Sequence, residues 1–180
     1  MAQYIAFLRA INVGGHTVKM EALRELFSTL GFSNVETFIA SGNVIFETKA
    51  APDRVLENKI EKLLESALGY GVGTFVRTDE EVRAISVYRP FSDETLKAAQ
   101  ALNICFLHEP LSPSAVDTVM SFRTGIDEFH VQGREVYWLC RTRQSDSTFM
   151  NKPFERAIKS PATFRSAKTI ARLAARYPAE

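Results

Sequence analysis

Residues 34–48, NVETFIASGNVIFET, decide the fold, because they place two apolar runs on either side of a Ser-Gly-Asn turn. The turn composition and the β-branched and aromatic flanks predict a hairpin of two strands, 35–39 and 44–48. A helix-spaced apolar pattern precedes this hairpin at residues 18–30, and another follows it at residues 56–67. The hairpin is therefore expected to lie between two helices in the chain order.

Two further strands complete this first half. Residues 4–8 are a short apolar run typical of a buried strand, and residues 71–78, GVGTFVRT, predict another. Thr17 is expected to be the N-cap of the first helix, Gly31 to follow its end, and Pro52 to lie in the first turn of the second helix. The resulting order βαββαβ is that of the ferredoxin-like unit, also called the αβ-plait or split βαβ.

The second half begins with a similar order. Residues 102–109 predict a strand, Ser112 and Pro113 are expected to start a helix, and residues 126–140 alternate as a hairpin around Gln132-Gly133. Helices are expected near 150–159 and 166–177, with no fourth strand between them.

The fold class is therefore predicted to be α+β. It has two ferredoxin-like halves with antiparallel sheets, and the second half is modified and ends in helices. The predicted divisions are a first unit at 1–88, a linker at 89–101 and a second unit at 102–180 with basic C-terminal helices.

The composition is that of an ordinary globular protein. Hydrophobic residues make up 46% of the 180 residues and charged residues 24%, which is enough to bury a core. No apolar stretch has membrane-spanning length, and the N-terminal residues lack the charged region of a signal peptide. Cys105 and Cys140 are too few for a disulfide framework. We expect a soluble cytoplasmic protein with reduced cysteines and no membrane partner.

Positive charge is concentrated at the C-terminal end. The net charge is +1, but residues 141–180 carry nine Lys or Arg against three Asp or Glu. A basic tail is typical of a surface for nucleic acid or phosphate, and also of a basic helix that packs on an acidic part of the same chain. Both interpretations stay open at this point.

The stretch 8–20, LRAINVGGHTVKM, leaves the first strand through an Asn and two adjacent glycines. In a split βαβ unit this loop and the hairpin turn lie at the same end of the sheet. The unsatisfied N–H groups at a helix start attract anions, and glycine lets the backbone approach a ligand. We therefore predict a phosphate or carboxylate site. The alternative is that these glycines only form tight turns. The predicted anion-binding residues are Arg9, Asn12, Gly14, Gly15, Lys19, Ser41, Gly42 and Asn43.

Other kinds of chemistry have weaker support in the sequence. There is no Walker pattern and no GxGxxG, and His16, His108 and His130 are scattered, so neither a metal nor a cofactor is expected. Pairing Ser41 with His16 as a nucleophile lacks an orienting carboxylate, and no general base is assigned. Four aromatic residues on predicted strands are candidates for an RNA-binding sheet face, although core packing is favoured: Phe7, Phe46, Phe106 and Tyr137.

These loops also carry a family resemblance. The chain resembles a bacterial family of domains of unknown function, the one numbered 1697, whose pattern is approximately LRGINVGG, a Met, an LG, then YIQSGNV and a Phe. The fitting residues are Leu8, Arg9, Ile11, Asn12, Val13, Gly14, Gly15, Met20, Leu30, Gly31, Ser41, Gly42, Asn43, Val44 and Phe46. A later segment fits at Asn151, Lys152, Glu155, Thr163 and Arg165. The resemblance implies two αβ-plaits and no established activity.

The chain departs from that family pattern at three places. Ala10 stands where Gly is usual, Ala40 where Gln is usual, and Ser166-Ala167 where Asn-Trp is usual. If the family's site depends on that Gln or Trp, this chain has an altered specificity or has lost the function.

Three functional hypotheses follow. The first is a binding module for a phosphate-bearing ligand, a nucleotide or RNA, at the edge formed by the 9–17 and 40–43 loops. Thr163, Arg165 and Lys168 would extend this surface. The second is an enzyme acting on a small anionic substrate, and the third is a structural or self-associating protein.

Overall fold

The computed structural model describes residues 1–12, 14–40 and 42–179. The chain forms two compact units, Met1–Ile85 with Leu173–Glu180 (unit 1) and Ser86–Arg172 (unit 2). Each unit contains a four-stranded antiparallel sheet. The division into 1–88, 89–101 and 102–180 stays a prediction.

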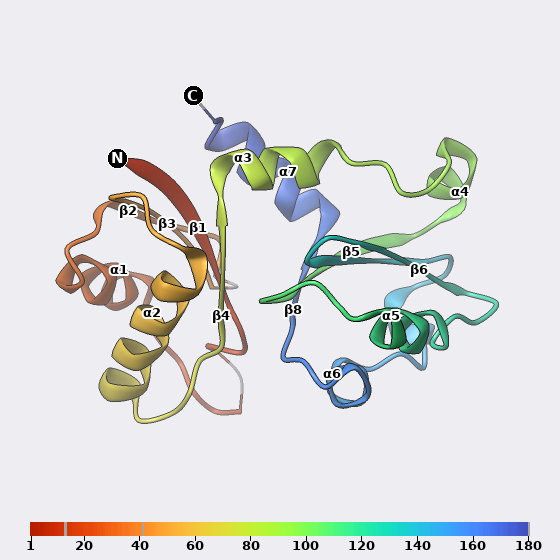
Figure 1. Ribbon diagram of the computed structural model, residues 1–180, viewed down its shortest axis with the longest axis horizontal. Helices are drawn as coiled ribbons and strands as arrows, with labels where there is room; N and C mark the ends of the chain where they lie inside the picture. The colour runs from red at the N-terminus through yellow and green to blue at the C-terminus, as the bar shows by residue number, and fades with distance from the viewer. Residues whose placement is uncertain (13, 41, 180) are drawn as a thin grey trace. The chain divides into compact units, whose positions relative to one another are not determined.

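Unit 1 has the predicted ferredoxin-like order (Figure 1). Its elements are β1 (Ala2–Leu8), α1 (Met20–Thr29), β2 (Ser33–Phe38), β3 (Asn43–Thr48), α2 (Asp53–Leu68) and β4 (Thr74–Thr78). The strands lie in the order β2-β3-β1-β4, so the first strand is central and pairs with both the third and the fourth. The chain continues from β4 into α3 (Asp79–Val87).

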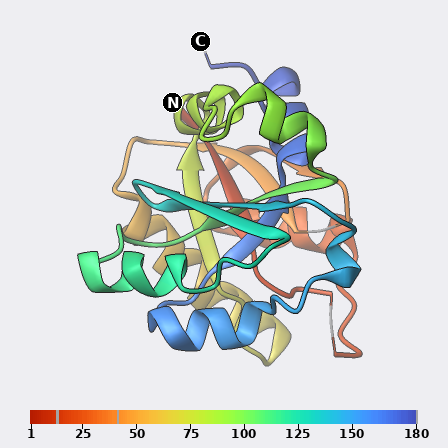
Figure 2. The ribbon, with the colours of Figure 1, turned by 90° about the vertical axis from the view of Figure 1, so that its right-hand side faces the viewer.

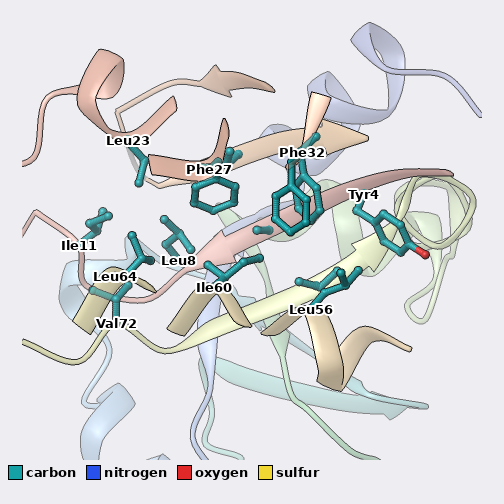
Figure 3. Close-up of a cluster of buried hydrophobic side chains, with 14 of the residues drawn as sticks. Tyr4, Leu8, Ile11, Leu23, Phe27, Phe32, Leu56, Ile60, Leu64 and Val72 are labelled. Atoms are coloured by element: carbon teal, nitrogen blue, oxygen red, sulfur yellow. The ribbon is translucent and has the colours of Figure 1, made fainter. Parts of the chain in front are cut away.

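The core of unit 1 lies between its sheet and the helices α1 and α2 (Figure 3). Alternate residues of β1 face this core, as expected for a strand with period two. Phe32 and Phe46 stack with ring centroids 4.4 Å apart, and Phe27 meets Phe46 edge-on at 5.7 Å. Aromatic pairs in these geometries add about 0.5–1.5 kcal/mol beyond area burial. The hairpin that decides the fold is thereby joined to the first helix.

Unit 2 has the same strand arrangement, β6-β7-β5-β8. Its elements are α4 (Asp93–Ala98), β5 (Ala101–Phe106), α5 (Pro113–Met120), β6 (Asp127–Gln132), β7 (Glu135–Cys140), α6 (Asn151–Ile158), β8 (Thr163–Ser166) and α7 (Ala167–Arg176), with a 3-10 turn at Gln144–Asp146. The unit boundary at Arg172 falls within α7. Helices α5 and α6 lie side by side over one sheet face (Figure 2). The prediction of two ferredoxin-like halves is confirmed.

The expected absence of a fourth strand in the second half is wrong. β8 follows α6 and pairs antiparallel with β5, with Ile104 opposite Arg165. It has only four residues, Thr-Phe-Arg-Ser, and its most buried positions are Thr163 and Arg165. A charged side chain that is buried on a short strand inverts the apolar alternation by which strands are recognised. The second half is therefore less modified than expected.

The first helix begins later than predicted. α1 starts at Met20, with Lys19 at the N-cap and no side-chain capping bond, so the N-cap prediction for Thr17 is wrong. The Val18 N–H donates to Asn12 Oδ1 at 2.8 Å, which holds Val18 in the loop. The expected position of Gly31 is correct, since it follows the helix end with φ 81°.

The four aromatic residues considered for an RNA-binding face are all buried. Phe7, Phe46 and Phe106 are fully buried, and Tyr137 is 2% exposed. Burial and neighbouring Glu135 raise the pKa of Tyr137. An RNA-recognition sheet needs exposed rings for stacking. Core packing is therefore confirmed as the interpretation of these residues.

The outer edge of β4 is closed by two carboxylates of α2. The Thr74 N–H donates to Glu61 Oε1 at 3.0 Å, and the Val76 N–H donates to Glu57 Oε1 at 2.9 Å. Glu57 is 1% exposed, and its other oxygen accepts from Arg54 at 3.1 Å. Satisfied N–H groups on an edge strand do not template pairing with another chain.

Replacing Glu57 with Ala leaves the Val76 N–H without its acceptor. We expect Glu57→Ala to lower the free energy of unfolding by about 1–3 kcal/mol, measured by urea denaturation. Glu57→Gln keeps an oxygen acceptor for the Val76 N–H and loses the charge that faces Arg54, so its loss should be clearly smaller. Equal losses in the two variants would contradict this account of the β4 edge.

Candidate functional site

Three loops meet at one end of the unit 1 sheet. The Leu8 N–H donates to the Gly42 carbonyl at 2.8 Å, and the Arg9 N–H donates to the Gly73 carbonyl at 2.8 Å. The loop after β1 therefore lies beside the turn before β3 and beside the segment before β4. The predicted convergence of the first two loops is confirmed, and the third was not foreseen. We call the described residues within 9–19, 39–43 and 69–73 the loop edge.

Asn12 ties two of these loops together with one side chain. Its Oδ1 accepts from the Val18 N–H at 2.8 Å, and its Nδ2 donates to the Ala40 carbonyl at 3.2 Å. The first bond closes its own loop, and the second joins it to the hairpin turn. Asn12 therefore shapes the loop edge through bonds within the protein.

The glycines of the loop edge have two different roles. Gly14 and Gly15 have φ values of 67° and 84°, and no atom lies within 4 Å of a Cβ built on either. They are needed for left-handed backbone, and the space around them is open. Gly42 also has left-handed backbone, with φ 79°, and a Cβ there would lie 3.0 Å from Ile11 and 3.1 Å from Leu8, so this glycine is needed for packing as well.

The other predicted residues differ in exposure. Asn43 is fully buried and its Nδ2 donates to the Phe38 carbonyl at 3.0 Å, which is a bond within the hairpin. Arg9 is half-buried, and Lys19 is exposed at the N-cap of α1. Ser41 lies outside the described residues. Arg9 and Lys19 are thus the cationic side chains that the prediction placed at this edge.

An aromatic pair at the loop edge escaped the sequence analysis. His16 stacks on Tyr70 with ring centroids 3.9 Å apart and planes at 25°, and the Tyr70 hydroxyl donates to the Ile11 carbonyl at 3.0 Å. Tyr70 follows Gly69, which ends α2 in left-handed backbone. An aromatic residue directly after a helix-ending glycine was the one sequence signal for it.

The predicted extension lies in unit 2. Arg165 donates through Nη1 to Thr163 Oγ1 at 3.0 Å and to the Phe164 carbonyl at 2.9 Å, and both side chains are buried. Burial lowers the pKa of Arg165 to about 10. Lys168 is exposed on α7. Thr163 and Arg165 therefore bond to each other and to the backbone of their own strand.

Two kinds of site were also sought across the described ranges. No group of three or more His, Cys, Asp or Glu side chains within 1–12, 14–40 and 42–179 is arranged to hold a metal ion. In those same ranges no helix is both long enough and apolar enough to cross a membrane.

The comparisons with known proteins identify a family and a fold. The model of a family described as "Protein of unknown function (DUF1697)" matches residues 1–137. The match includes the loop edge and stops before Asn151–Arg165, where the later resemblance was expected. A solved structure, the conserved bacterial protein SP0830 from Streptococcus pneumoniae, is similar with a TM-score of 0.79 and 22% identity over 99% of each chain. No curated protein matches the chain.

Substitutions at Asn12 test its role in the loop edge. We expect Asn12→Ala to speed hydrogen exchange at the Val18 amide and to lower the free energy of unfolding by about 1 kcal/mol. Asn12→Asp keeps the Oδ1 acceptor but cannot donate to Ala40, so it should retain Val18 protection. Exchange measured by NMR checks both, and unchanged protection in Asn12→Ala would refute the role.

Proposed function

The chain belongs to the DUF1697 family of proteins of unknown function, and we propose that it is a binding module for a small phosphate-bearing ligand, a nucleotide, held at the loop edge. We also infer a cytoplasmic location, which its two buried free cysteines, Cys105 and Cys140, support.

The bridging of two loops by Asn12 carries this proposal. It brings the hairpin turn against the loop that contains Gly14 and Gly15, whose surroundings are open. α1 begins at Met20, five residues after Gly15, and its N-cap makes no side-chain capping bond. The unsatisfied N–H groups and the dipole at the start of a helix favour an anion. Phosphate oxygens are acceptors suited to such N–H groups.

Charge and aromatic character support a nucleotide over a simple anion. Arg9 and Lys19 supply positive charge at the edge, with Glu21 in the first turn of α1 opposing it in part. The stacked rings of His16 and Tyr70 are the kind of platform on which a nucleobase lies. The phosphate of a nucleotide would thus meet positive charge at this edge, and its base would meet an aromatic surface.

RNA and catalysis have less support. The aromatic residues on the strands are buried, which removes the stacking surface that an RNA-binding sheet uses. His16 is stacked on the Tyr70 ring, and its predicted partner as a nucleophile, Ser41, lies outside the described residues. Since no general base is assigned, we favour binding over catalysis.

The test is titration with AMP, ribose 5-phosphate and inorganic phosphate, followed by NMR of the backbone amides. We expect AMP to shift the Gly14 and Gly15 resonances, with affinity falling as salt rises. Lys19→Ala should weaken binding by about three- to tenfold, as expected for one exposed charge. Lys62→Ala, an exposed lysine of α2, is the matched control and should bind as the parent does. Equal weakening by both variants would count against this site.

The base platform is tested separately. His16→Ala should weaken AMP binding by about tenfold and leave phosphate and ribose 5-phosphate binding unchanged, because a stacked base contributes about 1–3 kcal/mol. Calorimetry with the three ligands makes the comparison. If AMP binds no more tightly than ribose 5-phosphate, the ligand is a phosphate without a recognised base. If a short RNA binds far more tightly than AMP, the ligand is a polymer.

A further inference from the structure

A recess lies in unit 2, in a part of the chain that does not include the loop edge. It has a volume of about 330 Å³ and lies where α5 ends, β6 begins and α6 starts. Its lining residues are Ser121, Phe122, Thr124, Asp127, Thr148, Phe149, Met150 and Pro153. The lining combines apolar side chains, hydroxyls and one carboxylate. We call it the unit 2 cavity.

Asp127 is the charged group of this cavity, and it is only 1% exposed. Its Oδ1 accepts from Trp138 Nε1 at 2.8 Å, its Oδ2 accepts from Thr124 Oγ1 at 2.9 Å, and Ser147 Oγ lies 2.9 Å from both oxygens. These donors are all neutral. A carboxylate has about four acceptor positions, so three donors leave one of them open.

No cation balances this carboxylate among the described residues. Two arginines on neighbouring segments, Arg123 and Arg141, both face Glu128 instead, with N–O distances of 2.6 and 3.9 Å. Burying a charge without an opposite partner is costly even when neutral donors surround it. The cavity is therefore bordered by the negative charge of Asp127, and a bound cation would stabilise that charge.

The helix dipoles do not remove this charge. The start of α6 borders the cavity and contributes about +0.5 of an elementary charge, and the end of α5 borders it and contributes about −0.5. Because α5 and α6 each have eight residues, these two partial charges should be of similar size and should largely cancel. The charge of Asp127 then remains.

The apolar side chains that line the cavity favour a cation that carries an alkyl group. Phe122 and Phe149 meet edge-on with centroids 5.8 Å apart, and Met150 is 64% exposed. Aromatic rings and the thioether of Met contact alkyl groups well. Ser121 and Thr148 add hydroxyl oxygens that can accept hydrogen bonds, whereas Thr124 Oγ1 already accepts from the Ile126 and Asp127 N–H groups.

We propose that the unit 2 cavity binds a primary alkylammonium group. The ammonium lies over Asp127 and donates to the lining hydroxyls, and the alkyl chain lies against Phe122, Phe149 and Met150. Asp127 would repel an anion, and a neutral alcohol would leave the charge of Asp127 unbalanced. The unit 2 cavity and the loop edge share no residues, and their proposed ligands have opposite charge. The proposal for one site can therefore fail without affecting the proposal for the other.

The protein contains its own reporter for this test. Trp138 is the chain's one tryptophan; its indole N–H binds Asp127, and its ring lies 4.5 Å from that of Phe149. We expect n-butylammonium to change Trp138 emission saturably at constant ionic strength set with sodium chloride. 1-Butanol, which is similar in shape and neutral, should bind at least about tenfold more weakly. An equal response to both, or no saturable response to n-butylammonium, would overturn the proposal.

Substitutions that place a charge at Met150 test the proposal without removing Asp127, whose loss risks unfolding unit 2. Met150 is exposed at the N-cap of α6 and makes no side-chain capping bond there, so a charged side chain at this position would reach solvent. Met150→Lys should weaken n-butylammonium binding by about three- to tenfold, and Met150→Glu should tighten it by a similar factor. Both changes remove the same thioether, so a shift in the same direction in both variants would mean that charge is not recognised, and would overturn the proposal.

The ammonium group has two natural sources, a free alkylamine and a lysine side chain of another polypeptide. N-acetyl-lysine-N-methylamide, titrated beside n-butylammonium, distinguishes them. Tighter binding of n-butylammonium would identify the natural ligand as a free alkylamine. Tighter binding of the lysine derivative would identify it as a lysine side chain. Both results support recognition of an ammonium group.

Discussion

The loop edge depends on the central position of β1 in its sheet. Phe7 lies opposite Asn43 on one side and opposite Phe75 on the other. Because these three positions are level across the sheet, the chain leaving β1 and the chains entering β3 and β4 are brought to one place. The hydrogen bonds from Leu8 and Arg9 to Gly42 and Gly73 continue both ladders by one step into the loops. Antiparallel pairing alone thus assembles the loops.

The fourth strand of each unit shows an internal repeat. Arg77 lies opposite Ile5, and Arg165 lies opposite Ile104. Each arginine donates Nη1 to the carbonyl of the residue before it, at 2.8 and 2.9 Å. The next residue, Thr78 or Ser166, accepts from an N–H in the first turn of the following helix.

The same correspondence extends to the edge of each sheet. Glu61 accepts from the Thr74 N–H, and Glu155 accepts from the Ala162 N–H, which occupies the matching position three residues before the arginine. An edge strand exposes N–H groups that need acceptors, and a carboxylate from the preceding helix supplies one in both units. The repeat is therefore one of interactions: a helix carboxylate, a buried arginine and a hydroxyl cap.

The order of strands and helices in the first half, and with it the ferredoxin-like unit, could be predicted from the sequence because apolar periodicity and turn residues act over short distances. It also identified the glycine loops. It did not reveal β8, whose buried arginine hides the strand pattern, or the start of α1, which a side chain within the loop delays. Apolar periodicity does not reveal either interaction, since both depend on where a polar side chain finds its partners.

The interactions of the individual residues of the candidate site depend on contacts that the folded chain makes. Gly42 and Asn43 look like loop residues in the sequence, yet one is confined by Leu8 and Ile11 and the other is fully buried. His16 and Tyr70 are 54 positions apart in the numbering and stack through space. Asp127, Trp138 and Ser147 come from separate segments and meet through hydrogen bonds. These roles arise from contacts between distant parts of the chain, which form only when the sheets assemble.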